Sequence, residues 1–413
     1  MTDIFDVAVI GAGPAGMMAA IAAKSKTNKV ILLEKNASPG RKLLISGKGR
    51  CNVTTARDVE DIVKAFGENG KFLFSSLSQF SNQEVITFFE SRGVALKKER
   101  GERMFPVSNS SATILDCLVR ELAVADVEIK YNFPAKTISR ENDNFCISVG
   151  STPINARNLI ITTGGKSYPE TGSTGDGYVF AKTLGHTVIP AIPALVPLII
   201  KDVDLNNLAG LSLKNVELYF LSDNQVFAHD FGEMLFTHVG ISGPIVLRMS
   251  KKVYQELTGG NKVSAYIDLK PKLDEAILKQ RIISEVTQAP KKEYQSLLAT
   301  LLPKSLIPYA VAVTAIDKHL QSSTLNREQM AALIKFLKYF EFNIDGVEPI
   351  DNAIVTHGGV DTNEIDRKTM ESKIIPHLYF AGEVICLDGP TGGFNMQKAF
   401  STGFVAGKSA QAS

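Results

Sequence analysis

The first 35 residues alternate between apolar runs and a stretch of small residues. Val7–Ile10 is a short apolar run that fits a buried strand, and "MMAAIAAK" then has the composition of a helix of small residues. A second apolar run, "KVILLEK", ends at Glu34–Lys35. The order strand, helix, strand predicts a βαβ unit and therefore an α/β domain.

Two further helices are predicted between this unit and residue 130. "SNQEVITFFESRG" carries a capping box, formed by Ser81 and Glu84, and closes at Gly93. "SATILDCLVRELAVA" has apolar residues at helical spacing, and Cys117 falls among them. We expect Cys117, and Cys146 in "NFCISV", to pack as small apolar residues.

Short strands follow, from "EIKYNF" to "NLIITTGG". They resemble a meander in which residues 142–144, Asn-Asp-Asn, form a turn, and "NLIITTGG" fits a buried strand that runs into a glycine pair. After Leu273 the apolar spacing is helical and glycine is scarce. Near the C-terminus, "LYFAGE" predicts a strand and "MQKAFSTGFVAGKSA" a helix with small residues on one face.

The glycines between the first strand and helix form the pattern GxGxxG. Gly11 permits a tight turn, Gly13 lets the backbone approach a pyrophosphate, and Gly16 lets helix and strand pack closely. The N-terminus of the helix would face the phosphates, and Glu34 stands where an acid takes the ribose hydroxyls. This context indicates a dinucleotide site, although the motif alone does not separate FAD from NAD.

The segments after Glu34 favour FAD. Instead of another βα unit, the chain enters the glycine-rich, basic "RKLLISGKGRCN" and later the meander, an arrangement that resembles the FAD domains of the glutathione-reductase-like superfamily. In that superfamily a late strand ending in Ala-Gly and an acid meets the ribityl chain. The next helix points its N-terminus at the flavin pyrimidine edge, where it stabilises the charge of the reduced ring. Both ends of the chain would then build one discontinuous domain.

Composition narrows the class of protein. The 413 residues are 44% hydrophobic, enough for a large core, and 45 basic against 43 acidic residues leave a net charge of +2. Because this near balance gives no strong field, we expect neither nucleic acid nor membrane as a partner. Four cysteines without CxxC or zinc spacing, six dispersed histidines and no visible signal peptide predict a soluble cytoplasmic protein without a metal site.

Ordered motifs through nearly the whole chain resemble one family, the BaiN-like (YhiN-like, aminoacetone-oxidase-type) NAD(P)/FAD-dependent oxidoreductases. The resemblance rests on "GAGPAG", "RKLLISGKGRCNVT", "RMFPVSNSSATIL", "TTGGKSYPETGSTGDGYVFAKTLGH", "PALVPL", "GEMLFTHVGISGPIVL", "THGGVDTNEIDRKTMESK", "LYFAGEV" and "GPTGGFNMQKAF". It departs at Cys386, where the family commonly has Asp; Asp388 follows two positions later and can serve instead.

The resemblance implies a Rossmann-like FAD-binding domain with an inserted β-rich domain and a helical insertion. The FAD domain would cover 1–194 and 350–413, and the β-rich substrate domain 195–272, continuing at 341–349. The helical insertion would cover 273–340. The residues expected to bind FAD are Gly11, Gly13, Pro14, Ala15, Gly16, Glu34, Lys35, Arg41, Lys42, Ser46, Gly47, Gly49, Arg50, Cys51, Asn52, Thr163, Gly164, Gly359, Gly382, Glu383, Asp388, Gly392, Gly393, Phe394 and Asn395.

Two residues are candidates for chemistry beyond the cofactor. In "GEMLFTHVGISGP", a strand, a turn at Gly240–Gly243 and a helix beginning at Pro244 would create an oxygen-binding N-terminus, and His238 can exchange a proton there. A histidine that only hydrogen-bonds locally is the alternative. Cys51 lacks a CxxC partner or a nearby base, so we expect a packed residue in a flavin loop rather than a redox thiol.

Three functions remain open at this level. The first is NAD(P)H-dependent, FAD-mediated reduction of an activated C=C bond in a hydrophobic carbonyl compound, with His238 polarising the carbonyl. The second is an amine or aminoketone oxidase that uses oxygen. The third is an FAD-containing, RNA-associated protein, which the near-neutral charge disfavours. No second dinucleotide fingerprint is visible for NAD(P)H, and oligomeric state is not indicated.

Overall fold

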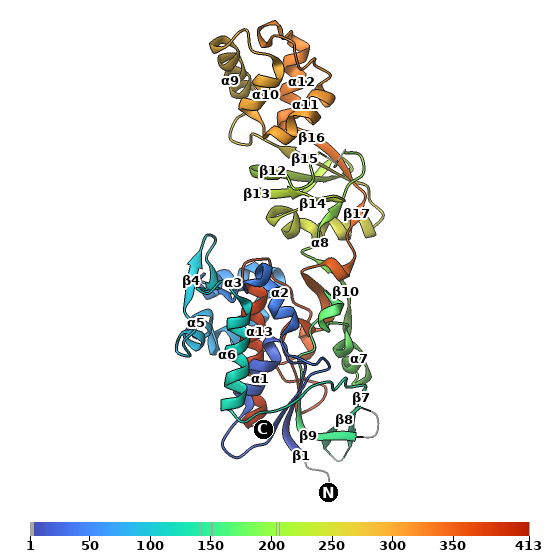
Figure 1. Ribbon diagram of the computed structural model, residues 1–413. Coiled ribbons are helices and arrows are strands. Elements are labelled where there is room, and N and C mark those ends of the chain that lie inside the picture. The colour runs from blue at the N-terminus through green and yellow to red at the C-terminus, as the bar shows by residue number, and fades with distance from the viewer. Residues whose placement is uncertain (1–3, 142, 150–151, 204, 206, 413) are drawn as a thin grey trace. The chain divides into compact units, whose positions relative to one another are not determined.

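A computed structural model describes residues 4–141, 143–149, 152–203, 205 and 207–412 (Figure 1). The described residues divide into two units. The first comprises Met1–Ala194 and Ala353–Ser413, and the second comprises Leu195–Asn352. Each unit has its own hydrophobic core. The mixed α/β fold with a Rossmann-type domain is the predicted class.

In its described residues, the first unit is built on a sheet of seven strands. Strand β9 belongs both to the parallel part of this sheet and to its antiparallel part. The strands are β6 (Glu128–Lys130), β2 (Val30–Leu33), β1 (Ile4–Ile10), β9 (Thr152–Ile161), β8 (Asn144–Val149), β7 (Thr137–Glu141) and β19 (Leu378–Phe380). Strands β6, β2, β1, β9 and β19 run parallel, whereas β7, β8 and the first part of β9 form an antiparallel meander.

Helices from the two ends of the chain pack together on this sheet. Helix α1 (Pro14–Ala23) lies beside α13 (Phe394–Ala412), and α6 (Ser111–Val124) flanks them (Figure 1). A Cβ on Gly403 would lie 2.3 Å from the carbonyl oxygen of Ala15, and one on Gly407 would lie 2.2 Å from that of Ala19. Small residues four apart therefore let the two helices touch, and this contact joins the termini into one domain.

The remaining elements of the first unit surround this core. A small sheet has the order β3 (Thr54–Thr55), β5 (Arg103–Pro106), β4 (Leu96–Glu99). Strand β10 (Val188–Ala194) pairs with β18 (Val355–Val360). The helices are α2 (Arg41–Gly49), α3 (Val59–Ala65), α4 (Phe74–Gln79), α5 (Asn82–Glu90) and α7 (Asp176–Thr183), and the capping box predicted for α5 is present at Ser81 and Glu84.

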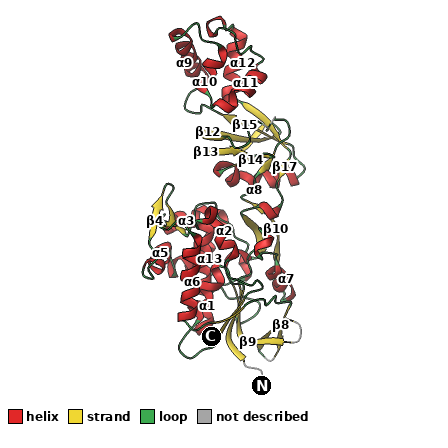
Figure 2. Ribbon diagram, viewed as in Figure 1, coloured by secondary structure: helices red, strands yellow, loops and turns green. Residues whose placement is uncertain are grey.

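In its described residues, the second unit combines another seven-stranded sheet with five α-helices. The sheet order is β16 (Phe340–Ile344), β15 (Val263–Asp268), β12 (Ser212–Ser222), β13 (Gln225–Phe236), β14 (Gly240–Ser242), β11 (Leu198–Ile199), β17 (Gly346–Val347). Helix α8 (Pro244–Thr258) buries Ile245, Val246, Met249 and Val253 against it. The other helices, α9 (Glu275–Gln288), α10 (Tyr294–Leu301), α11 (Ile307–Thr314) and α12 (Arg327–Lys338), gather away from α8 and share the sheet's core (Figure 2).

Three local predictions differ from the structure. The segment 41–49, expected as a loop, begins as a helix that Ser46, Gly47 and Lys48 interrupt. "EIK" belongs to the parallel sheet, as β6, rather than to the meander, because it pairs with β2. Residues 240–242, expected as a turn, form strand β14 because they pair with β11 and β13. Of the predicted 142–144 turn, residue 142 lies outside the described residues.

Candidate functional site, a dinucleotide cradle beside a buried ion pair

The turn between β1 and α1 has the geometry that a pyrophosphate requires. Gly11 has φ +100°, and a Cβ there would lie 2.8 Å from the carbonyl oxygen of Thr162. A Cβ on Gly16 would lie 1.8 Å from the carbonyl oxygen of Gly11, so Gly16 is required by packing. Gly13, the N-cap of α1, differs because a Cβ there would meet no atom within 4 Å. Open space therefore faces the helix N-terminus formed by Gly13, Pro14 and Ala15, where phosphate oxygens bind.

Glu34 ends β2 with a carboxylate that is held in place by backbone groups. Its Oε2 accepts a hydrogen bond of 2.8 Å from the Ala12 amide, and its Oε1 accepts one of 2.8 Å from the Asn36 amide. Oε1 also accepts from Asn36 Nδ2 at 2.7 Å, so it is Oε2, with its one hydrogen bond from Ala12, that retains an acceptor position for a ribose hydroxyl. The neighbouring Lys35 ammonium donates to Asp176 Oδ2 at 2.8 Å, so the Asp176 carboxylate balances the positive charge of Lys35.

The first turn of α2 places two basic residues differently from the sequence-based expectation. Arg41 and Lys42 were both expected among the residues that bind FAD. Arg41 Nη1 donates to Asn36 Oδ1 at 3.1 Å. Lys42 Nζ instead donates to Glu383 Oε2 at 2.8 Å and to the Ser167 hydroxyl at 2.6 Å. A carboxylate already balances the Lys42 charge, which leaves it a structural partner rather than a spare cation.

The end of α2 presents backbone near the expected cofactor. The Ser46 hydroxyl donates to the Leu43 carbonyl at 2.7 Å, which ends the regular helix. A Cβ on Gly47 would lie 2.9 Å from the Asn52 amide, so Gly47 is required by the turn itself. Gly49, with φ +79°, faces open space, since a Cβ there would meet nothing within 4 Å. Gly49 is therefore the position where a ligand can lie against the backbone.

Arg50 and Asn52 hold the segment to neighbouring elements. The Arg50 guanidinium pairs with Glu99, donates to Asn109 at 3.2 Å and lies 4.2 Å from the Phe105 ring centre. Arg50, which was expected among the FAD-binding residues, thus contacts the β4–β5 region. With its amide oriented to suit its neighbours, Asn52 accepts from the Gly393 amide at 2.9 Å and donates to the carbonyls of Thr54 and Met104.

Cys51 lies between these two residues and is fully buried. Burial raises the pKa of the Cys51 thiol to about 12, which outweighs the opposing hydrogen bond with Ser46. A thiol with this pKa carries almost no thiolate at neutral pH, and the thiolate is the reactive form. Its surroundings favour the packed residue over the redox thiol.

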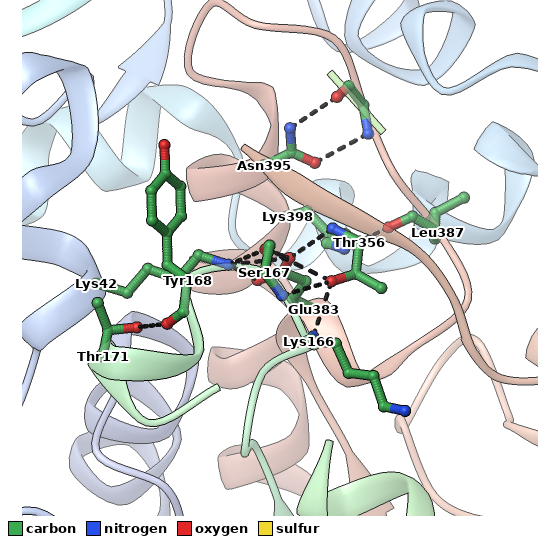
Figure 3. Close-up of polar contacts among 11 residues, drawn as sticks. Lys42, Lys166, Ser167, Tyr168, Thr171, Thr356, Glu383, Leu387, Asn395 and Lys398 are labelled. Atoms are coloured by element: carbon green, nitrogen blue, oxygen red, sulfur yellow. Dashed lines mark hydrogen bonds and ion pairs between the residues drawn. The ribbon is translucent and has the colours of Figure 1, made fainter. Parts of the chain in front are cut away.

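Residues from three separate segments converge on Glu383 (Figure 3). Glu383 Oε1 accepts from the Thr356 amide at 2.9 Å and from the Ser167 hydroxyl at 3.2 Å, in addition to the pair with Lys42. The Thr356 hydroxyl in turn accepts from the amides of Lys166 and Ser167 at 2.8 and 3.1 Å. Thr356 and Ser167 were missed from the sequence, because nothing local to them indicates a partner almost 190 positions away.

Burial and neighbouring charges act in opposite directions on the pKa values of Glu383 and Lys398. Burial acts to raise the pKa of the Glu383 carboxyl, but the Lys42 ammonium and the Thr356 amide together hold that pKa below its usual range. Lys398, in α13, is 2% exposed and donates to the Leu387 carbonyl (Figure 3). Burial lowers the pKa of the Lys398 ammonium, although Glu383 opposes the shift. Lys398, with Ala, Ser, Thr and Gly following it in that helix, was the available sign of a buried charge.

Asn395 fixes the turn that leads into α13. Its Oδ1 accepts from the Gly389 amide at 2.9 Å, and its Nδ2 donates to the Gly389 carbonyl at 2.7 Å (Figure 3). Gly392 and Gly393 have φ of +125° and +98°, and a Cβ on Gly393 would lie 2.3 Å from the Thr54 carbonyl oxygen. Phe394 is buried against Phe66. The N-terminus of α13 therefore has a defined position and direction.

Three other expected glycines and Thr163 complete the set. Gly359 was expected to admit the flavin ring, but a Cβ there would lie 2.3 Å from the Val384 carbonyl oxygen, so chain packing already requires it. A Cβ on Gly382 would lie 2.7 Å from that of Ala15, next to the GxGxxG turn. Gly164 follows β9 with φ +78°. Among the described residues, the buried Thr163 hydroxyl has no hydrogen-bond partner.

The two remaining candidates lie in different units. Asp388, in the first unit, pairs with His357 Nδ1. His238, in the second unit, lies exposed in the turn between β13 and β14, six residues before the N-terminus of α8. The structure holds Asp388 beside the Glu383 cluster, whereas His238 remains a proposed proton donor.

The residues of the first unit fit FAD. The open space at Gly13 and Gly49 is a cradle that a side chain would fill, and the orphaned Thr163 hydroxyl can bind a polar group of the ligand. When bound, FAD supplies hydride transfer, and the residues bind and orient it. Among the described residues, no cluster of three or more His, Cys, Asp or Glu side chains is placed to hold a metal, and no helix has the length and apolar character to span a bilayer.

Comparison with known proteins places this geometry in context. The profile of the HI0933-like protein Rossmann domain matches residues 5–409. A 3-dehydro-bile acid delta(4,6)-reductase of Clostridium scindens is 32% identical over 406 residues, which cover 98% of both chains. A ribosomal RNA dihydrouridine synthase of Escherichia coli is 32% identical over 404 residues, which cover 97% of this chain and 96% of that one.

A solved structure shares the fold at lower identity. The 3-ketosteroid-delta4-(5alpha)-dehydrogenase of Rhodococcus jostii RHA1, in complex with 4-androstene-3,17-dione, aligns with a TM-score of 0.54 and 14% identity. The alignment covers 100% of this chain and 98% of that chain. At this identity the likeness concerns the fold alone.

Proposed function

This chain belongs to the HI0933-like family, and from that premise we propose that it is an FAD-dependent reductase of C=C bonds conjugated with a carbonyl group. The substrate in this proposal is a hydrophobic carbonyl compound, and the electron donor is NADH or NADPH. The oxidoreductase class and FAD follow from the family and the cradle; the substrate and the donor are the proposed part.

The similarity to the bile acid reductase carries the proposal. It extends over 98% of both chains, so the two proteins share the cofactor domain and the inserted unit together. The name of that relative describes double bonds next to a 3-keto group, which is the activated C=C bond that the sequence motifs had suggested. A carbonyl withdraws electrons from such a bond and makes its β-carbon an acceptor for hydride.

The site supports reduction through the electrostatics of α13. Because Asn395, Gly392 and Gly393 fix the start of this helix, its positive end can stabilise the negative charge of a reduced flavin. His238, at an exposed turn before α8, is the proposed group that polarises the substrate carbonyl. The nicotinamide would bind transiently, because the sequence carries one dinucleotide fingerprint and FAD uses it.

A second candidate substrate is a uracil base in RNA. The similarity to a ribosomal RNA dihydrouridine synthase covers 97% of the chain at 32% identity, as high as the similarity to the bile acid reductase. The chemistry would be the same, because the C5=C6 bond of uracil is also conjugated with a carbonyl. The net charge of +2 favours a small substrate, but charge alone does not decide between substrates.

Anaerobic half-reactions test both proposals. The purified yellow protein would be mixed with NADH or NADPH, and the flavin absorbance at about 450 nm followed. The reduced enzyme would then be mixed with 4-androstene-3,17-dione or with an unmodified ribosomal RNA transcript. We expect nicotinamide to bleach the flavin and the enone to restore it. Reoxidation by RNA alone would select the second candidate. Reduction of the flavin by an added amine in place of nicotinamide, followed by peroxide release when air is admitted, would select an oxidase instead.

A further inference from the structure

His357 and Asp388 form a dyad outside the GxGxxG cradle. His357 lies on β18, and Asp388 lies 31 positions later, after β19 and the Glu383 turn. The contact joins His357 Nδ1 to Asp388 Oδ1. Because a carboxylate only accepts hydrogen bonds, Nδ1 carries the proton, and the ring is held in one orientation.

The other ring nitrogen of His357 is accessible. The side chain is 24% exposed, and that of Asp388 is 10% exposed. Among the described residues, Nε2 of His357 forms no hydrogen bond, and it is not one of the buried atoms that lack a partner. It is therefore open to solvent or to a ligand. The dyad therefore combines a carboxylate on one side of the imidazole with an outward nitrogen on the other, which is the arrangement of a general acid or base.

Surrounding contacts hold this dyad against the proposed flavin site. Thr356, which precedes His357, donates its amide to Glu383 at 2.9 Å. Gly389, which follows Asp388, is bound through both its amide and its carbonyl by Asn395 in the first turn of α13. Lys398 donates to the carbonyl of Leu387, on the other side of Asp388. These contacts fix both members of the dyad beside the helix N-terminus.

We propose that His357 is the general acid of the reduction and that Asp388 is its positioning residue; this inference rests on the proposed function. The substrate β-carbon would accept the hydride that a bound, reduced FAD supplies, so that a C–H bond forms there as the C=C π bond breaks. Its electron pair moves toward the α-carbon and the carbonyl. In its imidazolium form, with a proton on each ring nitrogen, His357 gives the Nε2 proton to the α-carbon, and the neutral Nδ1–H ring then regains a proton from water.

Holoenzyme variants of both residues test this role. His357→Gln and Asp388→Asn would be reduced anaerobically with dithionite, so that no step depends on the nicotinamide donor, and mixed with 4-androstene-3,17-dione. Flavin reoxidation should slow by roughly 10²- to 10⁴-fold in His357→Gln, the usual contribution of a general acid. His319→Gln is the matched control, because His319 Nδ1 also faces a carboxylate, Glu293, at 3.1 Å but lies in the second unit. It should reoxidise at the wild-type rate.

Two measurements read the dyad without turnover. A far-downfield proton resonance of Nδ1–H should be present in the wild-type holoenzyme and lost in both dyad variants. Diethyl pyrocarbonate should modify His357 at Nε2, and 4-androstene-3,17-dione should protect it. Both variants should retain FAD and the wild-type flavin potential.

The outcomes separate this inference from the proposed function. If the wild-type enzyme is not reoxidised by the enone, the proposed function fails and the acid role fails with it. If the wild type is reoxidised and His357→Gln matches it, only the dyad role is overturned. A shifted flavin potential in His357→Gln, with proportional slowing of flavin reoxidation, would instead assign His357 to the flavin and also overturn the role.

Discussion

Lys42 and Glu383 lie 341 positions apart and form an ion pair of 2.8 Å beside the dinucleotide cradle. The pair joins α2 to the turn after β19, and the Lys42 and Glu383 side chains are only 24% and 19% exposed, respectively. Ser167 and Thr356 supply further hydrogen bonds, so the carboxylate is satisfied only while this network is complete. Removing the charge of either Lys42 or Glu383 therefore leaves the other charge unpaired in a poorly hydrated site.

Lys42→Met should therefore reduce the free energy of unfolding by about 2–3 kcal/mol, because Glu383 would remain charged and unpaired. Lys42→Met combined with Glu383→Gln should lose less than Lys42→Met alone, since the uncompensated charge is gone. Urea denaturation of the three proteins measures this. Lys98→Met is the control, because Lys98 pairs with Glu102 at the surface and should contribute less than about 1 kcal/mol. A double variant with a lower free energy of unfolding than Lys42→Met would contradict this explanation.

The same pair predicts a dependence on pH. The folded-state pKa of Glu383 lies below its ordinary value of 4.5. Its contribution to stability is therefore complete above pH 4.5 and is lost as the pH falls below that value toward the folded-state pKa. The difference in unfolding free energy between wild type and Glu383→Gln should be constant near neutral pH and shrink below about pH 4.5. A difference that grew in acid would reverse the sign of the assigned shift.

Local pattern was sufficient to predict the elements but not their partners. The βαβ unit, the capping box of α5 and the C-terminal helix each depend on residues within a few positions of one another, such as Ser81 with Glu84. The partner of Lys42 depends on the whole topology, because β9 brings the start and the end of the chain together. The partners of Arg50 could not be predicted for the same reason: the sequence does not show that Glu99 and Phe105 lie within its reach.

Gly13 and Gly16, two glycines of the GxGxxG turn, should respond differently to an added methyl group. Gly16→Ala would place a Cβ 1.8 Å from the Gly11 carbonyl oxygen, so the apoprotein should lose about 3 kcal/mol or more. Gly13→Ala meets no protein atom and should change the stability of the apoprotein by less than about 1 kcal/mol. It should nevertheless weaken FAD binding on the order of tenfold, because the methyl group enters the phosphate space. Thermal unfolding and FAD titration give the two numbers, and a Gly13→Ala protein with normal FAD affinity would place the pyrophosphate elsewhere.

Cys51 should behave as a packed residue. Because burial raises its thiol pKa to about 12, native Cys51 should resist iodoacetamide at pH 8, while the partly exposed Cys146 reacts. Cys51→Ser should retain FAD and turnover. Mass spectrometry of alkylated peptides, before and after unfolding, measures the first point. Loss of turnover in Cys51→Ser with FAD still bound would establish a chemical role for the thiol.

Asn395 provides a test of the role assigned to the N-terminus of α13. Asn395→Ala removes the hydrogen bonds to the Gly389 amide and carbonyl and should loosen the turn, so FAD affinity should fall. Asn395→Asp keeps an acceptor for the Gly389 amide but adds a negative charge at the helix start. That charge is favourable for the helix itself and unfavourable beside a reduced flavin.

Asn395→Asp should therefore retain FAD better than Asn395→Ala and yet lower the flavin midpoint potential, because the added charge opposes the charge of the reduced ring. Potentiometric titration of the three holoenzymes separates these effects from simple loss of binding. Asn363→Asp, on a surface turn of the same unit, adds the same charge away from the helix and should leave the potential unchanged. If Asn395→Asp and Asn363→Asp had equal potentials, the helix start would not face the flavin, and the charge stabilisation assigned to α13 would have to come from another element.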